Sequence, residues 1–310
     1  MKKALFVYAL ALLALASCSK DADIENPKKE EVPDNIDHTD SKEWLSPLTV
    51  ASYNIEFDTG GDNPWSNRKE LVKRVFDKYT LDIAGVQEPS KKQLEDMLAL
   101  MPQYGLVGTD VRGETTVENR LTVTIFYKKD RIEIEDWGTF WLSETPTEAS
   151  GGWDAAQSRI CTWAKARDKN TQKEFYFFST HLDHVGTEAR TKGAQLLLDT
   201  IPKITAGYPA LLTGDFNSNQ NTSYYKSMVS SANIKDTYTL TKNKINAVRG
   251  TFNYYDIDQS ASTNYRIDHI FVTATPEVKI NRWGIYTDVF PGGKYPSDHF
   301  PVIVDVSFLK

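Results

Sequence analysis

The chain has 310 residues, a formal net charge of −6 and two cysteines, Cys18 and Cys161. A single cysteine after residue 18 excludes an intramolecular disulfide there, so stability must come from a hydrophobic core, which a chain of this length can supply. The acidic balance excludes the broad basic face that drives non-specific binding to duplex nucleic acid.

The first predicted element is an export signal at residues 1–18. Two lysines precede an apolar run from Ala4 to Ala16, which is too short and wrongly flanked for a stable membrane span. The ending LASC resembles the lipobox of bacterial lipoproteins, which implies that Cys18 is lipidated and becomes the mature N-terminus. Acyl chains would then hold the protein at a membrane. The alternative is an ordinary signal peptide with a chance cysteine.

Residues 19–46 are predicted to be a flexible acidic tether, because they are rich in Asp, Glu, Lys and Pro and nearly free of apolar residues. Most of the chain's negative charge lies in this segment, so the rest is close to neutral. The acids just after Cys18 resemble the signal that sends some lipoproteins to the outer face of the outer membrane. We therefore expect an outer-membrane lipoprotein, exposed at the cell surface.

From residue 47 to 310, strand-like and helix-like stretches alternate without a linker or repeat, which predicts one domain. Leu48–Phe57 and Leu81–Glu88 are predicted strands because they are rich in β-branched and aromatic residues. Residues 66–79 between them have apolar side chains at helical spacing. Ser90 and Gln93 have the spacing of a capping box, which predicts the start of another helix.

The middle of the domain is predicted to contain mostly strands. Residues 120–143 suggest a hairpin or meander, and residues 161–184 suggest two long strands joined by a turn. Two short buried strands follow at 209–217 and 266–273, and a helix with one apolar face is predicted at 187–201. Strands with helices outside them indicate an α/β layered sandwich.

Polar side chains gather at the ends of these strands. They are Asn54, Glu88, His181, Asp183, Asp215, Asn217, Asp268, Asp298 and His299. Each of the Asn and Asp residues alone is more often a turn former. Ligand-binding loops meet at strand ends in α/β folds, however, so the recurrence predicts that these side chains converge on one site.

The residue types indicate a metal-assisted hydrolase. Carboxylate and amide oxygens, with few histidines and no cysteine among them, suit Mg²⁺ or Mn²⁺ and argue against zinc. Two histidines beside such an ion can exchange protons near pH 7, which the acids cannot do. An ion, acids and paired histidines together predict hydrolysis of a phosphate ester.

Six motifs in series, SYNI, QE, STHLDH, GDFN, RIDHIF and SDHFPV, resemble those of the endonuclease/exonuclease/phosphatase superfamily over residues 48–308. The resemblance implies a four-layer α/β/β/α sandwich, in which two mixed β-sheets are flanked by helices and the site lies at one rim. Two further stretches look like a bacterial branch near the nocturnin-like and deadenylase-like members.

The resemblance also implies roles for single residues. Glu88 would be the principal metal ligand, Asn54 would help to hold the ion or its water, and Asp298 would be an acid on the metal side. Asp215 and Asn217 would position the attacking water and the phosphate.

His181 would stabilise the phosphoryl oxygens or protonate the leaving oxygen. His299 would act as a base or as a donor in the transition state, oriented by Asp268. Because neighbours on an extended chain point to opposite sides, we do not expect Asp298 to bond to the His299 ring. Arg159 and Arg190 would either bind the phosphate or form structural ion pairs.

The substrate stays open among three alternatives. The expected one is a phosphodiesterase or nuclease-like enzyme outside the cytoplasm, acting on nucleotides or single-stranded oligonucleotides. A phospholipid or sphingomyelin phosphodiesterase would need an exposed apolar hairpin, to which Phe140–Leu142 would contribute. The third alternative is a non-catalytic binding lipoprotein with the same fold. We expect a monomer.

Overall fold

The computed structural model describes residues 42–114, 123–257, 265–291 and 293–310. The predicted export signal at 1–18, with Cys18, and residues 19–41 of the predicted tether lie outside the described residues. Within the described ranges, no helix has the length and apolar character needed to cross a bilayer.

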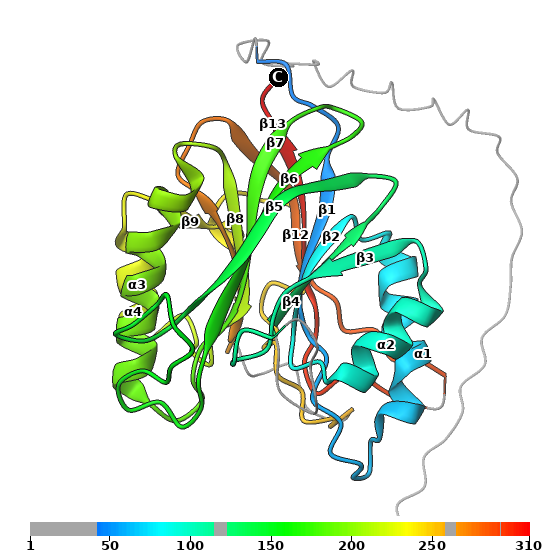
Figure 1. The fold of residues 1–310 in the computed structure, drawn as a ribbon. Coiled ribbons are helices and arrows are strands. Elements are labelled where there is room, and N and C mark those ends of the chain that lie inside the picture. Colours follow the sequence, from blue (N-terminus) through cyan, green and yellow to red (C-terminus); the bar gives the residue numbers. More distant parts are fainter. Residues whose placement is uncertain (1–41, 115–122, 258–264, 292) are drawn as a thin grey trace, which may run out of the picture. The chain divides into compact units, whose positions relative to one another are not determined.

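Two mixed β-sheets form the centre of the folded unit, as Figure 1 shows. The order of the seven-stranded sheet is β10 (Lys244–Ile245), β12 (Val278–Ile285), β13 (Val302–Phe308), β1 (Leu48–Asn54), β2 (Ile83–Gln87), β4 (Val123–Lys128) and β3 (Tyr104–Val107). The order of the six-stranded sheet is β5 (Ile132–Trp141), β6 (Ile160–Asp168), β7 (Glu174–His181), β8 (Ala210–Asp215), β11 (Asp268–Thr273) and β9 (Ile234–Asp236).

Helices cover the outer face of each sheet (Figure 1). The helical segments are α1 (Trp65–Tyr79), α2 (Lys91–Leu100), α3 (Thr187–Thr205), α4 (Ser223–Ser230) and a short 3₁₀ turn, η1 (Thr237–Thr239). The apolar stripes of α1 and α2 pack on the seven-stranded sheet, and those of α3 and α4 pack on the six-stranded one. The four-layer α/β/β/α sandwich is thereby confirmed.

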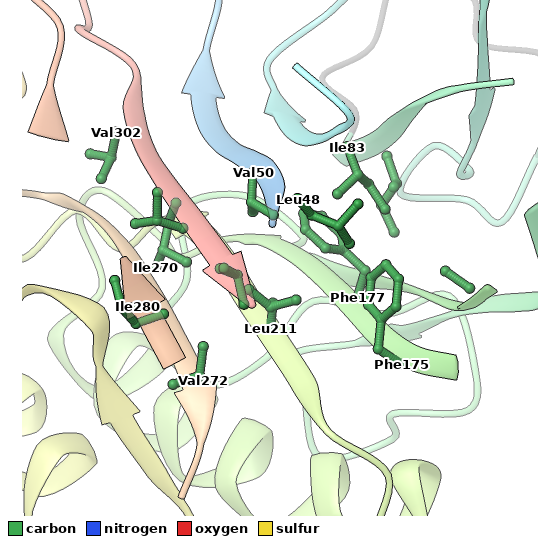
Figure 2. Packing of buried hydrophobic residues seen from close by; sticks show 14 of the residues in the cluster. Leu48, Val50, Ile83, Phe175, Phe177, Leu211, Ile270, Val272, Ile280 and Val302 are labelled. Atoms are coloured by element: carbon green, nitrogen blue, oxygen red, sulfur yellow. The ribbon is translucent and has the colours of Figure 1, made fainter. Parts of the chain in front are cut away.

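The largest hydrophobic cluster lies between the two sheets. Figure 2 shows side chains from both sheets in this cluster, among them Val50, Phe177 and Ile270. Strands buried on both faces have nearly continuous apolar runs, which explains why β8 is buried at every position. No disulfide joins the layers within the described residues, since Cys161 is buried as a free thiol.

Local signals place the helices that flank the site. The capping box of Ser90 and Gln93 is present at the start of α2, as predicted. Helix α3 begins at Thr187, where the sequence predicts it, and continues four residues past the predicted end at 201. Asp154, from a distant loop, accepts the backbone N–H groups of Glu188 and Ala189 at its first turn.

One predicted pairing is wrong. Residues 120–143 contain two strands, β4 and β5, but these do not form a hairpin, because β4 pairs with β2 and β3 while β5 pairs with β6 in the other sheet. The short turn between them crosses from one sheet to the other. Both strands carry apolar patterns that suit either partner, so the pattern alone does not reveal the crossing.

The folded unit begins earlier than residue 47. Leu45 donates its backbone N–H to Phe308, and Trp44 forms an antiparallel bridge with Leu309. The last residues of the predicted tether therefore pair with the end of the chain.

Candidate active site

Three site residues form a row across the six-stranded sheet. His181 of β7 lies opposite Asp215 of β8, and Asp215 lies opposite Asp268 of β11. Residues directly opposite one another on neighbouring strands project from the same face. The register therefore brings together one imidazole and two carboxylates that are far apart in the sequence, and all three are buried.

Asn54 joins this row to the other sheet. It ends β1 beside β2, and its amide nitrogen donates to Glu88 Oε1 at 3.0 Å and to Asp215 Oδ2 at 3.1 Å. Its Oδ1 accepts the backbone N–H of Glu56 at 2.9 Å. This arrangement favours a role for Asn54 in orienting the two carboxylates, since its oxygen is used by the backbone.

The contact between His299 and Asp268 is confirmed. Nδ1 of His299 lies 2.8 Å from Oδ2 of Asp268, although the residues are 31 positions apart. Asp298 bonds instead to the hydroxyl of Ser297 and lines the cleft described below. The adjacent acid and histidine therefore have separate surroundings, as expected from alternation along an extended chain.

Asn217 holds His181. The Asn217 backbone is left-handed, with φ of 47°, and its amide nitrogen lies 3.0 Å from Nε2 of His181 and 2.9 Å from the carbonyl oxygen of Leu182. Nε2 of His181 is also 3.3 Å from Oδ2 of Asp215. A non-glycine residue in this conformation is often found where function requires a fixed geometry.

These side chains line a cleft of about 350 Å³. Its lining residues are Phe57, Glu88, Gln157, Arg159, His181, His184, Asp215, Asn217, Phe252, Asp298 and His299. Gln157, His184 and the two phenylalanines were not predicted as site residues. His184 had a signal, because it ends the STHLDH motif, whereas nothing marks Gln157 within its polar loop.

The carboxylates of the cleft are crowded. Burial, followed by the charge of Asp268, raises the pKa of Asp215 to about 7. Burial also raises the pKa of Asp298 to about 6, with Glu56 and Glu88 adding to the effect. Buried carboxylates with too few cations are typical of a site that binds a positive ion.

The donor atoms fit a divalent metal ion. Single atoms of Glu88, His181 and Asp215 lie within 4.8 Å of one another, and so do atoms of Asp215, Asp268 and His299. Oxygen donors predominate, as Mg²⁺ or Mn²⁺ prefers. Glu88 and Asp298 are the two acids of the cleft that bond to neither histidine at hydrogen-bond distance, so they are the best candidates for ligands.

The two histidines differ in charge. Burial opposes a charge on His299, but Asp268 and Asp215 outweigh this and raise its pKa well above the usual value. Burial and the nearby Arg159 lower the pKa of His181 well below the usual value. These opposite shifts favour His299 over His181 as a charged donor to phosphate.

Arg159 faces the cleft and also forms an ion pair. Its Nε lies 3.3 Å from Oδ2 of Asp183, and its Nη2 lies 3.0 Å from Nδ1 of His184. The side chain is 7% exposed. An arginine held on one edge in this way is fixed in place to bind an anion with its other N–H groups.

Arg190 does not reach the cleft. Its guanidinium donates to the hydroxyls of Tyr224 and Thr187 and to the carbonyl oxygen of Asp183. Of the two alternatives for Arg190, these contacts favour the structural one over phosphate binding, since the residue braces the start of α3. Arg190 follows the STHLDH motif closely in sequence, but its side chain contacts Tyr224 of α4.

Asp183 organises the loop that carries Arg159. Its carboxylate accepts backbone N–H groups from Ala156, Gln157, Val185 and Gly186. Burial opposes ionisation, but these N–H groups and Arg159 hold the pKa of Asp183 well below its usual range. Asp183 therefore supports the site through backbone contacts and does not line the cleft.

Acids that share a cleft with a charged imidazole and a fixed guanidinium are suited to the transfer of a phosphoryl group to water. On this fold they place the chain among the phosphoester hydrolases. The chain belongs to the endonuclease/exonuclease/phosphatase family, whose model matches residues 51–299.

Three known proteins illustrate the relationship. A mannosyl-6-phosphatase of Bacteroides thetaiotaomicron is 37% identical, with a TM-score of 0.79, and the match covers 84% of this chain and 100% of that one. A family member of Bacteroides vulgatus is 34% identical, with a TM-score of 0.77, over 85% of this chain and 100% of that one. Nocturnin of Mus musculus is 24% identical over 304 residues, which cover 87% of this chain and 68% of nocturnin.

Proposed function

We propose that the chain is a divalent-metal-dependent phosphohydrolase that acts outside the cytoplasm on small phosphorylated molecules, with sugar phosphates as the first candidates. The observation that carries the proposal is the single cleft in which carboxylates, histidines and Arg159 meet. The name of the 37% identical relative, a mannosyl-6-phosphatase, supports a sugar phosphate. The predicted export signal supports action outside the cytoplasm.

Glu88 and Asp298 would hold the metal ion, with the Asn54 amide fixing the orientation of Glu88. A divalent cation bound there supplies positive charge that neutralises the phosphoryl oxygens. The chain's own residues supply the rest. Asp215 lies at the centre of the cleft and accepts a proton from the attacking water, and Asn217 fixes the position of its neighbours.

The phosphoryl group is bound from the opposite side. His299, charged and held by Asp268, donates a hydrogen bond from Nε2 to a phosphoryl oxygen. Arg159 adds N–H donors to another oxygen. His181 is neutral and keeps Asn217 in place. Two cationic side chains in addition to a metal ion suit the two negative charges of a phosphate monoester.

Hydrolysis of nucleotide or oligonucleotide phosphodiesters is the second candidate function. The observation that favours it is the group of aromatic side chains beside His299, since bases stack on such rings. The lipid alternative has lost its structural support, because Phe140, Trp141 and Leu142 are all less than 9% exposed and belong to the core. An apolar hairpin for entering a bilayer would have to be exposed.

A panel of substrates tests the proposal. The purified protein is incubated with mannose 6-phosphate, p-nitrophenyl phosphate, bis-p-nitrophenyl phosphate, single-stranded RNA and sphingomyelin, each with Mg²⁺, Mn²⁺ or EDTA. We expect release of phosphate from mannose 6-phosphate with Mg²⁺ or Mn²⁺, and no release in EDTA. Glu88→Gln should raise the metal concentration for half-maximal activity about tenfold or more.

Glu133→Gln is the matched control, because Glu133 is an exposed glutamate on β5. Faster turnover of bis-p-nitrophenyl phosphate or RNA than of the monoesters would favour the second candidate. Activity that persists unchanged in EDTA would refute metal dependence, and silence on every substrate would favour a non-catalytic binding protein.

A further inference from the structure

A second pocket, of about 430 Å³, opens beside the catalytic cleft. It shares Asn217, Phe252 and His299 with that cleft. Its other lining residues are Asn219, Tyr254, Tyr265 and Ile267. No step of the proposed hydrolysis uses these four residues. Its volume lies in the range of pockets that hold small organic ligands, so the two pockets together have room for more than a phosphate group.

The aromatic wall of this pocket is fixed to the segment that carries His299. Phe252 forms an antiparallel bridge with His299, and their ring centroids are 4.7 Å apart. Asn253 donates its backbone N–H to the carbonyl oxygen of Asp298 at 2.7 Å and its amide to that of Ser297 at 3.1 Å. A group bound in the pocket would therefore be held at a constant distance from His299.

Two tyrosines present their rings at the pocket although this leaves them in water. Tyr254 is 68% exposed and Tyr265 is 54% exposed. Tyr254 also has a left-handed backbone, with φ of 54°, which costs energy for a bulky residue. Exposed aromatic side chains that line a pocket offer flat apolar surfaces to a bound ligand.

We propose that this pocket holds the alcohol part of the substrate, as a polyhydroxylated ring of the pyranose type, and that Tyr254 and Tyr265 determine specificity for it. The inference rests on the proposed function and names the substrate class of the same site. Such a ring has an apolar face of C–H groups and hydroxyls around its edge. Tyrosine rings suit the face, and the amides of Asn217 and Asn219 suit the hydroxyls.

A nucleobase fits the pocket less well. A base can stack on one ring, but a base held on both of its flat faces needs two parallel rings. The rings of Phe252 and Tyr254 are tilted by 59° with centroids 4.0 Å apart, so they pack against each other and leave no parallel slot between them.

The test compares esters with and without a ring. The variants Tyr254→Ala, Tyr265→Ala and the double variant are assayed with mannose 6-phosphate, adenosine 5′-monophosphate and glycerol phosphate. We expect the double variant to raise KM for mannose 6-phosphate about tenfold, with kcat within about twofold of wild type. KM for glycerol phosphate, which has no ring, should not change.

Tyr208→Ala is the control, because Tyr208 is also exposed and precedes the opposite end of β8. Equal changes in KM for mannose 6-phosphate and glycerol phosphate, or no change in KM for either ester, would overturn the inference. A rise in KM for adenosine 5′-monophosphate alone would show that the pocket holds a base. If the wild-type protein hydrolyses none of these esters, the proposed function fails. Calorimetric titration with mannose 6-phosphate then tests the binding pocket on its own. Binding weakened by the double variant and not by Tyr208→Ala supports the pocket, whereas no binding refutes it.

Discussion

Asp268 acts on the site through one buried contact, its 2.8 Å hydrogen bond to the His299 ring. Its other oxygen, Oδ1, is buried and has no hydrogen-bond partner among the described residues. Burial of a carboxylate oxygen without a hydrogen bond is energetically unfavourable. Here the negative charge of Asp268 keeps His299 protonated and oriented. Asp268 is therefore a positioning residue.

Asp268→Asn should lower kcat about a hundredfold or more, because an amide neither stabilises the imidazolium nor preserves the orientation of the ring. The measurement is kcat for phosphate release, together with the unfolding midpoint. Asp130→Asn serves as the control, since the Asp130 side chain is 73% exposed. A folded Asp268→Asn protein with near wild-type kcat would contradict the role given to His299.

Asp183 allows a prediction on stability and pH. Because its folded pKa is lowered, its stabilising effect is complete above the unfolded value of about 3.9 and is lost as the pH falls through the folded pKa. Asp183→Asn should cost about 2 kcal/mol at pH 7, since several hydrogen bonds to a charged acceptor are weakened. The difference should persist at pH 5 and narrow below about pH 4.

Urea unfolding of wild type and Asp183→Asn at these pH values is the measurement. The exposed Asp62, replaced by Asn, provides the comparison. If the difference in unfolding free energy between wild type and Asp183→Asn stays constant from pH 7 to pH 3.5, the charge of Asp183 does not stabilise the loop.

At the scale of single residues, part of the site could be predicted from the sequence and part could not. The Asp268–His299 contact was implied by the family resemblance, whereas the alternation of side chains along an extended segment predicted only that Asp298 would not bond to the ring. The role of Arg190 stayed open because a guanidinium can reach in several directions from a helix, and only tertiary contacts decide among them. Gln157 lies in an irregular loop, whose course depends on Asp183 and on no local pattern.

At the scale of elements, the two sheets approach each other closely at Gly85. A Cβ added to Gly85 of β2 would lie 2.0 Å from Thr213 Oγ1 and 2.6 Å from Ser179 Oγ. Gln87 and Ser179 are hydrogen-bonded across this contact at 3.1 Å. Gly85 is thus required for the spacing that brings Asn54 within reach of Asp215.

Gly85→Ala should destabilise the protein by about 2 kcal/mol or more, because the contact is between strands and cannot relax easily. The double variant Gly85→Ala/Thr213→Ala should recover part of the loss, because it removes the nearest atom. Chemical unfolding measures both. Gly61→Ala, whose added Cβ has its nearest neighbour at 3.7 Å, should change nothing. A Gly85→Ala protein of wild-type stability would show that the sheets can move apart freely.

Most elements were predictable because their patterns are local, as the α2 capping box shows. The β4–β5 segment was not, since its two strands are separated by a tight turn, which favours a hairpin in isolation. The pairing is decided by distant strands, because β4 pairs with β2 and β5 pairs with β6. Pairings of this kind depend on the whole sandwich and are absent from any single window of sequence.

For the whole molecule, we propose that Cys18 anchors the protein to the outer membrane and that the folded unit faces the outside as a monomer. Cys18→Ala should then move the protein from the membrane fraction to the soluble fraction without changing kcat. Fractionation and immunoblotting measure this, and protease treatment of intact cells tests surface exposure. An unchanged membrane fraction would refute anchoring through Cys18.

Strand β13 has a consequence for how the molecule is made. It comes last in sequence among the described strands, yet it lies inside the seven-stranded sheet between β12 and β1, and His299 lies shortly before its start at Val302. During synthesis or export, the sheet stays split until residues 302–308 arrive, and the edges of β1 and β12 are left unpaired, which invites aggregation. A chain without residues 302–308 should therefore be inactive, because β1 and β12 would lack the strand that joins them.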